Sequence, residues 1–226
     1  MKRIITLNIA GRKNIDARID VIVRFLDEEN ADIVCFQEVT FGDFQSLVHK
    51  INTCLLNPYE FIQADLAEKY TKDNESQTDG LAILSRDEIY ETKTITLTKV
   101  PDDENGRPDF HRRIAQLVTL MNGIKIANTH LASNNNSHLQ FEELLKVIPN
   151  DYILSGDFNL PKQKILDRKT IWSEPYSCSI DYKDYTSFPK ENQTFDYILV
   201  PKSANIIDVR IAEGLSDHNA IICDIV

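Results

Sequence analysis

The most restrictive feature of the sequence is the segment Ser-Gly-Asp-Phe-Asn at 155–159, which follows directly on an apolar run at 152–154. Such a transition predicts a buried strand that opens into a loop. Residues two apart on a strand face the same way, so Asp157 and Asn159 can point at one target. The carboxylate could bind a metal or accept a proton from water, and the amide could orient that water. A second interpretation stays open, in which the two residues only close a turn.

Other predicted strands also adjoin the acids, amides and histidines that a hydrolytic site needs. These residues are Asn8 in 6–9, Gln37 and Glu38 after 32–36, Thr129 and His130 after 124–128, Asp196 in 195–200, and Ser216, Asp217 and His218 before 220–222. Functional groups often gather at one edge of a sheet scaffold. The sequence therefore predicts one shared polar site.

The spacing of apolar residues predicts a mixed α/β chain with many strands. Helices are predicted near 14–29, 41–55 and 138–148. Strands are predicted at 3–9, 32–37, 60–64, 80–85, 88–98, 112–120, 124–130, 151–156, 195–200, 206–212 and 219–225. The polar, aperiodic segments 67–79 and 101–110 are predicted to be loops. A chain of 226 residues without an obvious linker fits one domain, 1–226, better than two.

Charge and cysteine usage narrow the class of protein. A formal net charge of -10 argues against a general polyanion-binding surface but leaves room for a local cationic site or a metal. The four cysteines show no CxxC spacing, and Cys35 and Cys223 lie in apolar strand patterns. Buried free thiols suit a reducing compartment, so we expect a cytoplasmic protein. The first apolar stretch is too short for a signal peptide, and no apolar run reaches membrane-spanning length.

In chain order, these motifs resemble the endonuclease/exonuclease/phosphatase superfamily of metal-dependent phosphoesterases. The motifs that carry the resemblance are Asn8, Gln37-Glu38, Thr129-His130, 156–159, Asp196 and 216–218. The resemblance extends from residue 3 to residue 225. The resemblance implies an α/β fold of four layers, an α/β/β/α sandwich of two mixed β-sheets flanked by helices. It also implies that the motif-bearing strand ends meet at one rim and that Mg²⁺ or Mn²⁺ is the cofactor.

The resemblance assigns Glu38 as the first choice of metal ligand. Asn8 would assist Glu38 by a contact in the coordination shell of the metal or with a phosphate oxygen. Asp217 would lie at or near the metal. Magnesium prefers oxygen ligands and keeps several waters, so one or two carboxylates suffice. No cysteine is expected to take part. The alternative is that these residues only end strands or cap turns.

The resemblance places the proton chemistry on His218, whose imidazole Asp196 would orient. Asp157 is the rival general base, and the sequence does not decide between them. Asn159 is predicted to be a catalytic residue together with Asp157. His130 would hydrogen-bond a non-bridging phosphate oxygen, or it is a structural histidine.

Substrate contacts are the least specific part of the sequence. Arg112 and Arg113 precede an apolar strand, where they could clamp a phosphate or lie in solvent. A second basic segment, 162–169, could contact nucleic acid or form an ordinary charged face. Trp172 and Tyr176 follow it and could stack on a base or pack in the core.

We therefore expect a divalent-metal-dependent phosphoesterase, and more specifically a phosphodiesterase or nuclease that acts on nucleic acid ends or on short or distorted strands. A phosphatase or phosphodiesterase for a small metabolite or lipid headgroup is the enzymatic alternative. A non-catalytic binding module that keeps the fold is a third hypothesis, disfavoured because the main site residues are present. The sequence predicts no membrane insertion and indicates no obligate protein partner.

Overall fold

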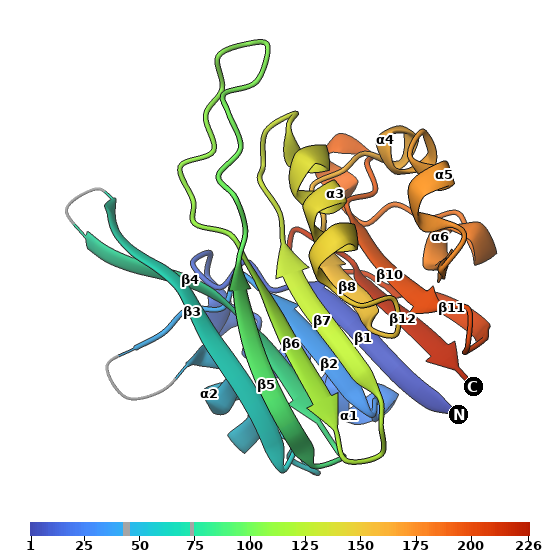
Figure 1. Cartoon of the computed structure of the whole chain (residues 1–226). Helices are drawn as coiled ribbons and strands as arrows, with labels where there is room; N and C mark the ends of the chain where they lie inside the picture. Colours follow the sequence, from blue (N-terminus) through green and yellow to red (C-terminus); the bar gives the residue numbers. More distant parts are fainter. Residues whose placement is uncertain (43–45, 73–74) are drawn as a thin grey trace.

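The computed structural model describes residues 1–42, 46–72 and 75–226. Two mixed six-stranded sheets stack face to face (Figure 1). In pairing order, the first sheet contains β11 (Ile206–Ala212), β12 (Ala220–Ile225), β1 (Lys2–Asn8), β2 (Ile33–Gln37), β4 (Glu75–Ser85) and β3 (Phe61–Lys72). The second contains β5 (Ile89–Thr96), β6 (Ile114–Leu120), β7 (Lys125–His130), β8 (Ile153–Asp157), β10 (Asp196–Pro201) and β9 (Tyr176–Cys178).

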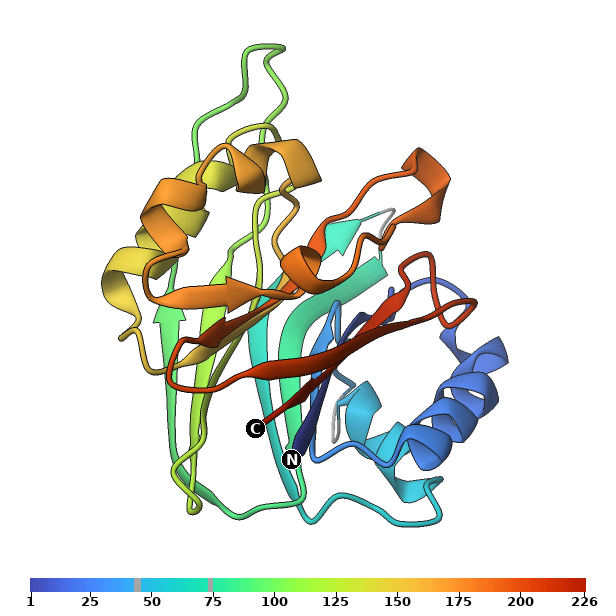
Figure 2. The ribbon, with the colours of Figure 1, turned by 90° about the vertical axis from the view of Figure 1, so that its right-hand side faces the viewer.

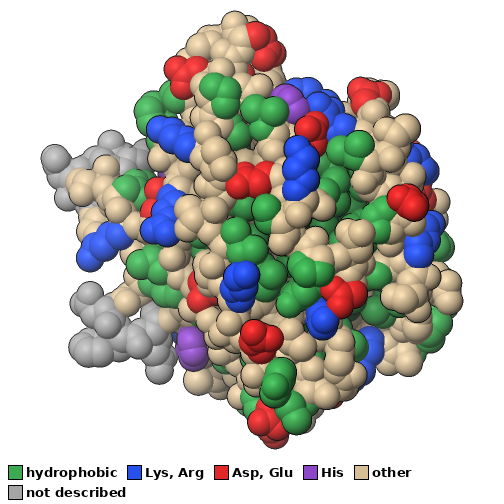
Figure 3. Space-filling model, viewed as in Figure 1, with side chains coloured by type: hydrophobic (Ala, Val, Ile, Leu, Met, Phe, Trp, Pro, Cys, Tyr) green, Lys and Arg blue, Asp and Glu red, His purple; other side chains and the backbone are tan. Residues whose placement is uncertain are grey.

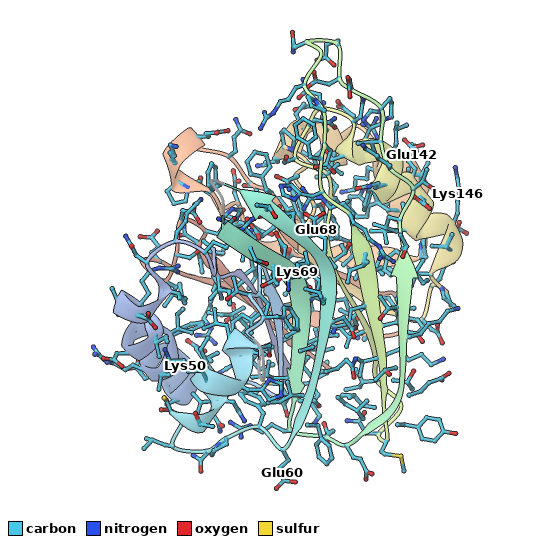
Figure 4. All side chains as sticks on the ribbon, turned by 90° about the vertical axis from the view of Figure 1, so that its left-hand side faces the viewer. Lys50, Glu60, Glu68, Lys69, Glu142 and Lys146 are labelled. Atoms are coloured by element: carbon cyan, nitrogen blue, oxygen red, sulfur yellow. The ribbon has the colours of Figure 1, made fainter. Side chains whose placement is uncertain are left out.

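Helices cover the outer faces of the sheets and confirm the predicted α/β/β/α sandwich (Figure 2). They are α1 (Ile19–Glu29), α2 (Leu47–Thr53), α3 (Ser137–Val147), α4 (Lys162–Leu166), α5 (Lys169–Trp172) and α6 (Ser179–Tyr182), with 3-10 turns η1 (Ile15–Ala17) and η2 (Pro189–Glu191). Lys50 on α2 and Lys146 on α3 lie on opposite sides of the molecule (Figure 4). No helix in the described ranges is both long and apolar enough to cross a bilayer.

The alternation of side chains along each strand divides them between two cores. On β1, Ile4 packs in the core that includes residues of both sheets, whereas Ile5 and Leu7 pack with residues of α1 and α2. All three side chains are fully buried. This burial explains why the strands could be read from their apolar patterns.

Polar side chains join the two sheets near the ends of β2 and β7. Gln37 of β2 donates a 2.7 Å hydrogen bond to Asn128 of β7. The Asn128 amide in turn donates to the backbone oxygens of Phe36 and Ala82 in the first sheet. Gln37 and Asn128 are fully buried, so these bonds fix the sheets relative to each other beneath the strand ends that carry Glu38 and His130.

The predicted loop at 67–79 is wrong, because β3 and β4 continue through it as a long antiparallel hairpin. Residues 73–74 of this segment lie outside the described ranges. Glu68 and Lys69 stand on the extended part of β3 (Figure 4). Besides backbone pairing, polar contacts hold this part, such as those of Glu68 with His111 and of Tyr70 with Arg12. Apolar periodicity therefore gave no signal.

Two further expectations differ from the structure. The helix expected at 41–55 begins only at Leu47, and its predicted residues 43–45 lie outside the described part of the chain. The segment between β8 and β10, for which no element was predicted, contains α4, α5, β9 and α6. These elements have three to five residues each. Elements of this length are too short to show a hydrophobic period.

Candidate active site

Two pairs of parallel strands deliver the predicted polar residues to one rim. β1 ends at Asn8 beside Gln37, the last residue of β2, and Glu38 follows. β7 ends at His130 beside Asp157, the last residue of β8. Because the carboxyl ends of parallel strands meet at one edge, these side chains come from both sheets to one place.

Asp196 reaches the same rim from an antiparallel strand. Asp196 is the first residue of β10 and lies opposite Asp157 in the register of β8 and β10. The hydroxyl of Ser187 accepts the backbone N–H groups of Phe195 and Asp196 at 2.8 and 3.0 Å. Ser187 thereby fixes the start of β10, and with it the position of the Asp196 carboxylate.

Gly156 explains why a glycine precedes Asp157. Its φ is +143°, and a Cβ atom there would lie 2.0 Å from the backbone oxygen of Thr129. Only glycine permits this approach of β8 to β7. The close pairing holds Nε2 of His130 at 3.5 Å from Oδ2 of Asp157.

Asn8 joins two carboxylates. Its Nδ2 lies 3.1 Å from Oε1 of Glu38 and 3.1 Å from Oδ2 of Asp157. Its Oδ1 accepts the backbone N–H of Ala10 at 3.0 Å. The amide group of Asn8 thus holds the Glu38 and Asp157 carboxylates in place, while its oxygen keeps one lone pair for the predicted contact with a metal or a phosphate oxygen.

His218 lies between two buried carboxylates. Its Nδ1 is 2.8 Å from Oδ2 of Asp196, and its Nε2 is 3.8 Å from Oδ2 of Asp157. The ring of Phe188 packs against the imidazole with a centroid distance of 4.8 Å. The predicted pairing of Asp196 with His218 is therefore present in the structure, and Phe188 was not foreseen.

Burial and charge set the protonation of this cluster. Burial lowers the pKa of His218, but the charges of Asp196 and Asp157 outweigh it and raise the pKa to about 10. Burial raises the pKa of Asp157, and Asp196 raises it further, to about 7. Burial lowers the pKa of His130 well below its usual value, and Arg113 adds to this effect. At neutral pH, His218 therefore carries a proton and a charge, and His130 is neutral.

Two side chains fasten the loop that carries His218. Ser216 donates a 2.6 Å hydrogen bond to the backbone oxygen of Asn8 and accepts the N–H of His218 at 2.8 Å. Arg18, at the start of α1, donates to four backbone oxygens, those of Ile9, Ala10, Lys13 and Leu215. Together they tie the segment after β1 to the segment before β12. The serine of the Ser-Asp-His motif is therefore a positioning residue.

Glu38 and Asn159 have left-handed backbones, with φ of +53° and +48°. Asn159 donates its backbone N–H to Oδ1 of Asp157 at 2.9 Å, and its Nδ2 bonds the backbone oxygen of Leu131 at 3.0 Å. The side chain is thus anchored to the protein in this geometry. Residues other than glycine rarely adopt such φ values outside functional or turn sites.

The donor set fits a divalent cation held through oxygen. The carboxylates of Glu38 and Asp157 converge on the same amide group, and Oδ1 of buried Asp196 has no hydrogen-bond partner among the described residues. Asp157, Asp196 and His218 also place ligand atoms within 4.8 Å of one another. Because Nδ1 of His218 already bonds Asp196, we favour the oxygens near Glu38 for a hard cation.

A cleft of about 500 Å³ opens beside these residues. Glu38, Asn159, Asp217 and His218 line it. The carboxylate of Asp217, a predicted neighbour of the metal, forms a 2.6 Å ion pair with Lys13. The cleft therefore gives a substrate access to Glu38 and His218 together.

The two arginines predicted to clamp a phosphate are placed differently. Arg113 is buried, and its guanidinium forms two hydrogen bonds with Asp109. Arg112 donates to the hydroxyl of Thr96, and neither arginine lines the cleft. Both line a small hollow next to His130 instead, and the i,i+4 spacing of Asp109 and Arg113 was the sequence signal for their pairing.

Trp172 and Tyr176 are fully buried, so the idea that they stack on a substrate base is wrong. The indole of Trp172 donates to the backbone oxygen of Ile165.

Basic residues on the viewed face are interspersed with acidic ones rather than gathered in a stripe (Figure 3). The described side chains on this face therefore form no broad basic stripe.

Sequence reasoning also missed Arg12. Its guanidinium lies 3.1 Å from Asp79 and 3.5 Å from Oε2 of Glu38, and it packs over the ring of Tyr70. Arg12 therefore holds Oε2 of Glu38, and Asn8 holds Oε1 of the same carboxylate. These partners come from β3, β4 and the residue after β2, which no local pattern connects to Arg12.

A model of the Endonuclease/Exonuclease/phosphatase family matches residues 5–218. The chain belongs to this family. Its members hydrolyse phosphate esters. A comparison with curated proteins finds no significant match.

Solved structures of the endonuclease/exonuclease/phosphatase fold resemble the whole chain. One from Beutenbergia cavernae superimposes with a TM-score of 0.82 at 16% identity, over 99% of this chain and 71% of that one. D. rerio TDP2, complexed with single strand DNA product, gives 0.69 at 17% identity over 100% and 98%. Mannosyl-6-phosphatase Bt3783 from Bacteroides thetaiotaomicron gives 0.68 at 15% identity over 100% of both chains. At these identities the likeness concerns the fold.

The raised pKa of His218 has a consequence for stability. Its folded pKa of about 10 lies above the unfolded value of about 6.5, so its contribution is fully present below pH 6.5 and is lost as the pH rises towards 10. We expect the melting temperature of EDTA-treated protein to fall more steeply between pH 6.5 and 10 than that of the His218→Gln variant. Parallel curves from differential scanning calorimetry would contradict this coupling.

Proposed function

We propose that this chain is a divalent-metal-dependent phosphodiesterase that acts on nucleic acid ends or on short or distorted strands. The observation that carries the proposal is the continuous set of contacts from Glu38 through Asn8 and Asp157 to His218. Both ends of this set line the same cleft. It supports assigning Glu38 as metal ligand, Asp157 as general base and His218 as a cationic imidazole of one site.

In this proposal Glu38 holds the cation with its carboxylate, while Asn8 and Arg12 keep that carboxylate in place. The cation, when bound, neutralises charge on the phosphoryl oxygens and favours ionisation of water. Asp157 accepts the proton of the attacking water, because a base with a pKa near 7 is suited to this step at neutral pH. His218, held protonated by Asp196, donates a hydrogen bond to a phosphoryl oxygen.

The alternative substrates remain a small metabolite phosphoester or a lipid headgroup, and the non-catalytic binding module is the third possibility. The names of the similar structures include both a DNA-bound protein and a sugar phosphatase, so likeness of fold does not choose between them. The overall charge of -10 favours a short contact with nucleic acid over extended tracking along a duplex. All four cysteines are free, in support of the proposed cytoplasmic location.

Turnover of bis-p-nitrophenyl phosphate with Mg²⁺ tests whether the chain is an enzyme. We expect hydrolysis that EDTA abolishes and Mg²⁺ or Mn²⁺ restores. A panel of single-stranded, duplex and frayed oligonucleotides, a hexose phosphate and a phospholipid headgroup then tests the substrate. The Asp157→Asn protein, purified in the same way, controls for contaminating nucleases. Good turnover of a small phosphoester without any oligonucleotide cleavage would replace the nuclease proposal, and no turnover at all would favour the binding module.

A further inference from the structure

Two cations in the cleft lack the acidic partners that their neighbours have. Arg107 and Lys164 both line the cleft. Their neighbours along the basic segment are paired: Lys162 with Asp184, Arg168 with Glu142 and Lys169 with Asp181, at 2.6 to 3.2 Å. Across the described ranges, no carboxylate oxygen lies within 4.0 Å of the side-chain nitrogens of Arg107 or Lys164. These two charges are therefore available to an anion.

The loop between β5 and β6 holds Arg107 in a defined place. One oxygen of the Asp103 carboxylate accepts the backbone N–H groups of Asn105 and Arg107, at 3.0 and 2.9 Å. The amide of Asn134 donates to the backbone oxygens of Pro101 and Arg107, at 3.1 and 3.0 Å. Asp103 and Asn134 are both buried. Arg107 thus stands on a fixed backbone with an exposed side chain and shares the lining of the cleft with Asn134.

The three consecutive asparagines at 134–136 also fix the position of Lys164. Its Nζ donates a 2.9 Å hydrogen bond to the backbone oxygen of Asn135. Asn136, the next residue, donates to the backbone oxygens of Pro101 and Asp102. The run 134–136 therefore connects the β5–β6 loop to α4. It brings together two cations that lie far apart in the sequence.

We propose that Arg107 and Lys164 form a subsite for a second phosphate of the substrate, beside the phosphate that is hydrolysed. This inference rests on the proposed function, because Glu38 and His218 line the same cleft. A substrate with one phosphate would leave the two cations unused once its phosphate sits at Glu38. A strand of nucleic acid carries a phosphate at every nucleotide and can occupy both places.

Glu191 also lines the cleft and opposes a second anion. Lys13 and Asp217 of the lining pair with each other, so Arg107 and Lys164 outnumber Glu191 among the remaining charges apart from Glu38 and His218. The subsite therefore selects for a strand with at least two phosphates. It also explains how a chain with a net charge of -10 can bind nucleic acid through a short contact.

A matched pair of substrates tests the subsite. Dithymidine monophosphate has one phosphate, and the same compound phosphorylated at both ends adds one on either side. We expect the wild-type protein to prefer the second compound. The ratio of the two kcat/KM values for internal cleavage should fall by on the order of tenfold for each of Arg107→Gln and Lys164→Gln, the scale of a charged hydrogen bond. Lys162→Gln, on the same helix but paired with Asp184, should keep the wild-type ratio.

The outcomes separate this inference from the proposed function. Cleavage of both compounds with a ratio that the double variant leaves unchanged would overturn the subsite and leave the phosphodiesterase standing. No metal-dependent cleavage of either compound, or of an aryl phosphodiester, would overturn the proposed function itself. A hexose bisphosphate serves as a third substrate. If it were preferred over the dinucleotide, with the same sensitivity to Arg107→Gln, the second phosphate would belong to a metabolite and the inference of a strand would be wrong.

Discussion

Replacing His218 with alanine, or Asp157 with asparagine, is expected to lower turnover by at least about 10²-fold, the usual scale for acid–base and positioning groups. His218→Ala removes the protonated imidazole that would bond a phosphoryl oxygen. Asp157→Asn keeps the shape of the side chain but removes its ability to accept a proton. Steady-state turnover of an aryl phosphodiester measures both effects. His49→Ala, on α2 and bonded to Ser46, is a matched control that should retain activity.

A double-mutant cycle tests how Asp196 acts. Its carboxylate bonds Nδ1 of His218, so Asp196→Asn should lower turnover only through the imidazole. Adding Asp196→Asn to His218→Ala should then cost little more than His218→Ala alone. Additive losses would show that Asp196 has a separate role, such as binding the cation through its unbonded Oδ1. Melting curves should accompany the cycle, because removing one partner of a buried ion pair also destabilises the fold.

Glu38→Gln is expected to raise the Mg²⁺ concentration required for half-maximal activity by at least about tenfold, since a neutral amide is a far weaker ligand for a hard cation. The substitution preserves the size of the side chain and an oxygen that can accept from Asn8. Titration of activity with Mg²⁺ after EDTA treatment gives the measurement. Glu60→Gln, an exposed change at the other end of the β3–β4 hairpin (Figure 4), serves as the control. Unchanged activity of Glu38→Gln at limiting Mg²⁺ would remove Glu38 from the metal site.

The parts of the fold that follow from burial could be predicted from the sequence. Strands such as 3–9 and 124–130 have apolar residues that fill the core, and the polar residues at their ends stand out for that reason. Asn8, Glu38, Asp157, Asp196 and His218 could therefore be identified, because each interrupts or ends an apolar run. The structure brings these residues to one rim, as the family resemblance implied.

The parts that depend on pairing over long distances could not be predicted. The extended β3–β4 hairpin is held by backbone pairing and by polar contacts with distant residues, and neither leaves a mark on apolar periodicity. Arg12 meets Asp79 and Glu38 only after three separate segments converge. The bonds of Arg113 to Asp109 could not be distinguished from a phosphate contact by sequence alone, because both uses call for the same basic residue.

The left-handed backbone at Glu38 sets stability and activity against each other. A glutamate at a φ of +53° costs on the order of 1–2 kcal/mol relative to glycine, which adopts this conformation freely. Glycine at this position would relieve the strain and remove the carboxylate in the same step. Laboratory evolution of this protein for heat resistance alone should therefore be expected to erode its chemistry, and any such selection needs a parallel requirement for turnover.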